Sequence, residues 1–78
     1  MRVLVTMRNG PPHVYLVKLH GQNVIDEVMS LIDRQKHSQA IVTAMTKGSV
    51  ERVVYGDEMK SLRADLVLSR NNALWDLT

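Results

Sequence analysis

The segment Val24–Lys36 constrains the fold most, because its apolar residues recur with the period of a helix and not with that of a strand. At 100° per residue, six apolar side chains fall on one arc of roughly 160°, and the other side is taken by Asp26, Glu27, Ser30, Asp33 and Arg34. Asn23 stands where an N-cap is wanted, and Arg34 and Lys36 lie near the negative end of the helix dipole. The segment therefore predicts a helix with one dry face. The apolar set is Val24, Ile25, Val28, Met29, Leu31 and Ile32.

Two alternating segments precede this helix and predict a β-hairpin. Arg2–Arg8 alternates in strand fashion and stops at residues 9–12, N-G-P-P, where the prolines withhold amide donors and Asn-Gly favours a reversal. The alternation resumes over His13–His20. The face expected to lie under the helix carries Val3, Val5, Met7, Tyr15, Val17 and Leu19.

Further strands are expected after the helix. Gln39–Thr46 is rich in β-forming residues and uncharged, which predicts a buried strand, and Val50–Tyr55 predicts its hairpin partner. Asp57–Arg70 leaves two alternatives open: a short helical turn near Glu58–Leu62 followed by a strand at Asp65–Ser69, or one continuous second helix. The expected fold is α+β: a small antiparallel sheet of four or five strands in the order ββαββ, with one main helix packed on one face.

The length and composition favour a small cytoplasmic protein. We expect one domain over residues 1–78, with a thin stability margin for which self-association would compensate. The absence of cysteine fits a reducing compartment. The first eight residues place five residues between two arginines, too few for a signal-peptide core, and no apolar run is long enough to span a membrane.

No constellation of residues suited to catalysis is evident in the sequence. The three histidines, His13, His20 and His37, match no metal-binding spacing, and there is no cysteine to complete a site. The serines stand in no nucleophile-elbow context, and the four isolated glycines form no phosphate loop. We therefore expect no enzymatic activity, no metal and no cofactor.

The apolar surface exceeds what one helix can cover. The second face of the hairpin shows Leu4, Val14 and Leu16, which the chain's own C-terminal segment, a second copy or a different macromolecule could cover. The C-terminal segment carries Leu74, Trp75 and Leu77, which either pack under the sheet or anchor a partner. These six residues are the expected partner-binding set.

Two function hypotheses follow from these features. The leading one is a non-catalytic protein-interaction module, a small regulator or inhibitor that occupies a surface of another protein and acts as a homodimer. The alternative is a small DNA- or RNA-binding regulator, because Arg2, Arg8 and Lys18 share one sheet face and the net charge is +2. The sequence has few aromatic residues on which bases could stack, which favours the first hypothesis.

Overall fold

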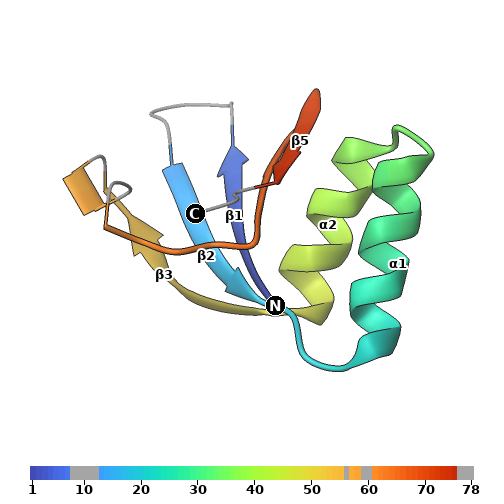
Figure 1. Cartoon of the computed structure of the whole chain (residues 1–78), viewed down its shortest axis with the longest axis horizontal. Coiled ribbons are helices and arrows are strands. Elements are labelled where there is room, and N and C mark those ends of the chain that lie inside the picture. Colours follow the sequence, from blue (N-terminus) through green and yellow to red (C-terminus); the bar gives the residue numbers. More distant parts are fainter. Residues whose placement is uncertain (8–12, 56, 59–60, 76–78) are drawn as a thin grey trace.

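Two helices pack on one face of a five-stranded sheet in the computed structural model, which describes residues 1–7, 13–55, 57–58 and 61–75 (Figure 1). The fold is therefore α+β, as the sequence predicts. The elements in chain order are β1 (Arg2–Met7), β2 (His13–Lys18), α1 (Gln22–Asp33), α2 (His37–Lys47), β3 (Ser49–Val54), β4 (Leu66–Ser69) and β5 (Asn72–Trp75).

The sheet is mixed, whereas the sequence predicts an antiparallel sheet. Its strand order is β3-β2-β1-β4-β5, and β1 runs parallel to β4 while the other neighbouring pairs are antiparallel. The expected order ββαββ with one main helix is also wrong, because two helices follow the first hairpin. The chain reaches one edge at β3 and then crosses to the far side of β1 to form β4 and β5.

The β1–β2 hairpin has the predicted faces. Val3 lies opposite Val17, and Val5 lies opposite Tyr15. Two further hydrogen bonds join the residues just outside the strands: the amide of Leu19 donates to the carbonyl of Met1 at 2.8 Å, and the amino group of Met1 donates to the carbonyl of Leu19 at 3.2 Å. The predicted inner face is therefore confirmed for its described side chains; that of Met7 lies outside them.

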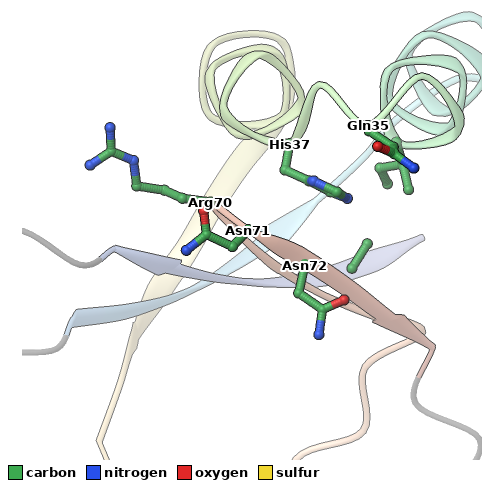
Figure 2. Close-up of a pocket in the computed structure, with 7 residues that line it drawn as sticks. Gln35, His37, Arg70, Asn71 and Asn72 are labelled. Carbon is green, nitrogen blue, oxygen red and sulfur yellow. The ribbon is translucent and has the colours of Figure 1, made fainter.

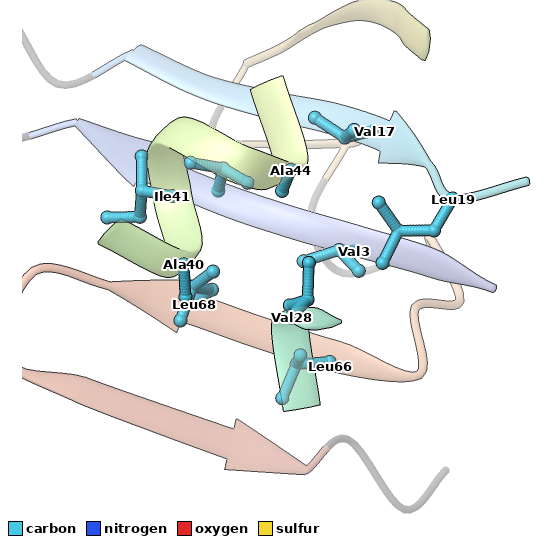
Figure 3. Close-up of a cluster of buried hydrophobic side chains, with 10 residues drawn as sticks. Val3, Val17, Leu19, Val28, Ala40, Ile41, Ala44, Leu66 and Leu68 are labelled. Carbon is cyan, nitrogen blue, oxygen red and sulfur yellow. The ribbon is translucent and has the colours of Figure 1, made fainter. Parts of the chain in front are cut away.

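The larger core lies between this face of the sheet and the helices (Figure 3). Side chains from both helices meet the inner rows of β1, β2 and β4, and Tyr15 packs partly buried against them. We call this cluster the helix-side core. Its buried members are Val3, Val5, Val17, Leu19, Val28, Ala40, Ile41, Ala44, Leu66 and Leu68.

The first helix, α1, is the predicted amphipathic helix, shifted towards the N-terminus. Gly21 is its N-cap with φ +80°, a conformation that favours glycine, so the expected cap at Asn23 is wrong. Val28 is fully buried, and the other apolar residues of α1 pack partly buried against the helix-side core. The predicted dry face is thus the one that meets the core.

The C-terminus of α1 is closed by a Schellman motif. The amide of Lys36 donates to the carbonyl of Leu31 at 2.8 Å, and the amide of Gln35 donates to the carbonyl of Ile32 at 2.9 Å. Gln35 adopts φ 58°, the left-handed conformation in which this motif usually places glycine. This tight end turns the chain directly into α2.

The second helix, α2, replaces the strand predicted over Gln39–Thr46. Its buried residues Ala40, Ile41 and Ala44 follow a helical spacing, and the alanines allow the helix axis to lie close to the sheet. Val42, which would be covered in a buried strand, is 61% exposed. β3 is confirmed as a strand, but it pairs with β2 and not with residues 39–46.

The second face of the hairpin is sealed by the chain itself. Leu4 and Leu16 are 3% and 2% exposed, because Leu62 and Ala64 from the connection between β3 and β4 pack over them. The connection is tied to the start of β1, where the amide of Asp65 donates to the carbonyl of Arg2 at 2.9 Å. We call this second cluster the loop-side core. It consists of Leu4, Leu16, Val54 and Ala64, with Val14, Leu62 and Val67 packed against it.

This connection settles the alternatives for residues 57–70. A short turn forms in which the amide of Leu62 donates to the carbonyl of Glu58 at 3.1 Å, and the strand β4 follows. The predicted turn followed by a strand is therefore present, and the continuous second helix is not. Arg52 of β3 pairs with the Glu58 carboxylate at 2.9 Å, an ion pair that links the turn to the sheet.

Candidate protein-binding edge

The strand β5 forms one edge of the sheet. It follows β4 through the two-residue turn Arg70–Asn71, which is braced by a hydrogen bond of 3.2 Å from the Ser69 hydroxyl to the carbonyl of Asn72. β5 pairs with β4 on its inner side, and no strand among the described residues pairs with its outer side. The backbone groups along that outer side are therefore available to another strand.

Leu74 and Trp75 point to opposite sides of this edge. Trp75 lies opposite Leu66 and so faces the helix side, whereas Leu74 lies opposite Val67 and faces the loop side. The two side chains are 56% and 53% exposed, respectively. Ala73 lies opposite Leu68 and packs against the helix-side core. Two large apolar side chains thus flank an open strand edge.

The opposite edge, β3, is of a different kind. It carries Glu51 and Arg52, both exposed, and Arg52 is held by its ion pair with Glu58. Charged side chains on an edge strand discourage another strand from pairing with it. β5 has the sequence N-A-L-W and carries no charge, so it is the less protected of the two edges.

A polar cleft of about 560 Å³ borders the start of β5 on the helix side. Figure 2 shows Gln35 from the turn between the helices and His37 from the start of α2 on one side of it, and Arg70, Asn71 and Asn72 from the β4–β5 hairpin on the other. The apolar part of its lining is Ile32 and Ala73.

The predicted partner-binding residues fall into three groups. Leu4 and Leu16 are buried under the connection between β3 and β4, and Val14 is half-buried beside them. Of the three covers considered for this face, the chain itself supplies one, through Leu62 and Ala64 and not through its C-terminal segment. Leu77 lies outside the described residues. Leu74 and Trp75 are exposed, as a binding role requires. The expectation that the C-terminal segment packs under the sheet is not met by these two side chains.

Sequence reasoning missed that residues 72–75 form a strand. The available signal was the pair Asn71-Asn72, which favours a turn, following the alternating segment 65–69. A turn after a strand predicts a hairpin, and four residues suffice for its second strand. Recognising this would have placed Leu74 and Trp75 on a sheet edge.

The residues of the alternative nucleic-acid hypothesis are only partly brought together. Arg2 and Lys18 lie directly opposite each other on β1 and β2, and both are exposed. The Asp65 carboxylate accepts a hydrogen bond of 3.0 Å from the amide of Arg2, which places a negative charge beside the pair. Arg8 lies outside the described residues.

Within the described part of the chain, no group of three or more histidine, aspartate or glutamate side chains is arranged to hold a metal ion. Neither of the two helices described has the length and apolar character that crossing a membrane requires.

Comparisons of this chain with protein-family models, with curated proteins and with solved structures find no match. Its function must therefore be inferred from its own surface.

Proposed function

We propose that this chain is a non-catalytic protein-interaction module that binds other protein chains through β5. It acts as a small regulator or inhibitor by occupying a surface of its partner, and it associates with itself through the same edge. The observation that carries the proposal is the uncharged edge strand with two exposed apolar side chains, Leu74 and Trp75. The second face of the hairpin does not support the proposal, because the chain itself covers that face.

The tryptophan is large enough to act as an anchor. With 53% of its surface exposed, it offers about 130 Å² to a partner if a full side chain presents about 250 Å². At about 25 cal/mol per Å², covering that surface would contribute about 3 kcal/mol before the costs of association. That magnitude is typical of the few residues on which an interface depends.

The geometry favours strand addition as the mode of binding. An extended segment of a partner would pair its backbone with the outer side of β5 and satisfy the edge groups there. Leu74 and Trp75 would then contact side chains of the added strand from the loop side and the helix side, respectively. Backbone pairing supplies affinity in this mode, and the two side chains supply selectivity.

Capture of partner proteins from a lysate of the source cells tests the proposal. Wild type and the Tyr55→Ala variant should retain the same partner, because Tyr55 is 70% exposed but follows β3, at the other edge. Trp75→Ala and Leu74→Lys should lose it. Retention of that partner by both β5 variants would show that β5 is not the binding surface.

Nucleic-acid binding is a second candidate, favoured by the exposed pair Arg2 and Lys18. Two phosphate contacts would give a dependence of log K on log salt concentration with a slope of about −2. The Arg2→Glu/Lys18→Glu variant should abolish binding in this case and leave capture of a protein partner unchanged. Titration of a labelled single strand and of a labelled duplex at several salt concentrations measures both effects.

A further inference from the structure

We infer that a second copy of this chain occupies β5, pairing antiparallel with Leu74 on the two-fold axis and Trp75 across from Ala73 of the partner. The inference rests on the proposed role of β5 as a protein-binding edge and names one occupant of that edge. Three observations carry it: the faces of the β5 side chains, the small size of Ala73, and the cleft that borders it.

Symmetry limits how two β5 strands can pair. Antiparallel strands at the edges of two sheets are related by a two-fold axis perpendicular to the joined sheet, so both helix layers lie on the same side. Residues directly opposite each other must share a face. Trp75, on the helix side, can therefore lie opposite Asn71, Ala73 or Trp75 of the partner, and not opposite Leu74.

The register centred on Leu74 is the best matched of those that symmetry allows. It places Leu74 against the partner's Leu74 on the loop side, and each Trp75 over the partner's Ala73 on the helix side. A centre at Ala73 would set Trp75 opposite Asn71, a polar turn residue. A centre at Trp75 would set two indole rings directly opposite each other.

In this register the large side chain of Trp75 on each copy lies over the small side chain of Ala73 on the other. Ala73 presents only a methyl group, and it lines the cleft of about 560 Å³ together with Ile32. The partner's Trp75, placed over Ala73, lies at the apolar part of this cleft. Gln35 and His37 line the polar part of the same cleft. An indole suits a site that is apolar at one end and polar at the other.

The charge distribution selects the β5 edge for self-pairing. A dimer formed by pairing two β3 strands would bring Glu51 and Arg52 of both copies into the interface. Two β5 strands would bring none of these charges together, since N-A-L-W is neutral. The short strand keeps the interface small, so the dimer should dissociate on dilution, with a Kd weaker than about 1 µM.

Cysteine cross-linking tests the register, because the chain has no cysteine of its own. Residues directly opposite each other on antiparallel strands have Cα atoms about 4.5–5.5 Å apart, within the range that a disulfide bridges. Val50 on β3 is 43% exposed and serves as the control position. Under mild oxidation the Leu74→Cys variant should form a covalent dimer at about ten times the yield of the Val50→Cys variant. Equal yields, or no cross-link at position 74, would overturn the register.

A charge exchange at position 74 supplies an independent test. Leu74→Lys and Leu74→Glu should each be monomeric by sedimentation velocity, because the two-fold axis sets like charges opposite each other. An equimolar mixture should recover the dimer. Trp75→Ala should weaken the dimer at least about tenfold and Tyr55→Ala less than twofold. A dimer that persists in all three β5 variants would overturn the inference.

These results separate the inference from the proposed function. A wild-type chain that stays monomeric at every concentration, while its β5 variants lose a captured protein, would overturn the second-copy inference and the proposed self-association, and it would leave the binding of other proteins through β5 standing. A monomeric chain whose captured partner is unaffected by the β5 variants would overturn both. Circular dichroism of each variant shows whether the fold is retained, as exposed positions lead us to expect.

Discussion

The replacement of Gly48 by alanine tests how closely α2 is held against the sheet. Gly48 follows the last residue of α2, and its amide donates to the carbonyl of Ala44 at 2.9 Å. A Cβ atom at this position would lie 2.6 Å from that oxygen, 2.9 Å from Leu19 Cδ2 and 2.9 Å from Val17 Cγ1. The backbone angles, φ −87° and ψ 179°, are open to any residue, so the substitution acts by crowding alone.

The expected loss is about 2 kcal/mol of unfolding free energy. Overpacking of a core costs about 1–3 kcal/mol, and three contacts below 3.0 Å, one of them with a backbone atom, point to the upper end. The reduced entropy of the unfolded chain returns about 0.4–1 kcal/mol. For a chain of this length, whose total stability is about 4–12 kcal/mol, the melting temperature should fall by about 8–16 °C.

Urea denaturation followed by circular dichroism measures this loss. Ser49→Ala, at the exposed neighbouring position, is the control and should stay within about 0.5 kcal/mol of wild type. In a Val17→Ala background one close contact is removed, so Gly48→Ala should cost less there than in wild type. A Gly48→Ala variant as stable as wild type would refute the close packing of α2 on β2.

Three further results are expected. Gln35→Gly should raise the unfolding free energy by about 1 kcal/mol in urea denaturation, because Gln35 holds a left-handed conformation that glycine adopts without strain. Leu16→Ala should cost about 2–5 kcal/mol at every protein concentration, since the chain itself buries Leu16, whereas a concentration-dependent loss would mean that a second copy covers it. Acrylamide should quench Trp75 fluorescence strongly in dilute solution and less at high protein concentration, and unchanged quenching would contradict burial of Trp75 in a dimer.

The first hairpin and α1 could be predicted because their local patterns agree with their tertiary environment. The alternation that put Val3, Val5 and Val17 on one face is the alternation that the helix-side core uses. The apolar arc around Val28 was likewise the face that α1 buries. Where local period and burial coincide, a single sequence suffices to assign the element and its inner face.

The second helix could not be recognised from residue preferences. Ile41, Val42 and Thr43 are β-branched and favour a strand, and the segment carries no charge before Lys47. The buried set combines Ile41 with Ala40 and Ala44, whose small side chains contribute little to a hydrophobic pattern. Tertiary packing against the sheet therefore overrides the local preference, and the spacing of two alanines was the only sign of it.

The cover of the second face and the order of the strands depend on contacts between distant parts of the chain. Leu62 and Ala64 pack over Leu4 and Leu16, more than forty positions away, and β4 lies parallel to β1 across a similar separation. No local pattern encodes such pairings. The same limit applies to the candidate site, since the exposure of Trp75 depends on β5 being the last strand of the sheet.

The position of the candidate site follows from what the fold leaves open. The helices cover one face of the sheet and the connection between β3 and β4 covers the other, so neither face requires a partner. Of the two edges, β3 is guarded by Glu51 and by the ion pair of Arg52 with Glu58. The outer side of β5 combines an open backbone edge with exposed Leu74 and Trp75. A protein that binds there gains both backbone pairing and apolar burial, and for this reason we assign the interaction to this strand.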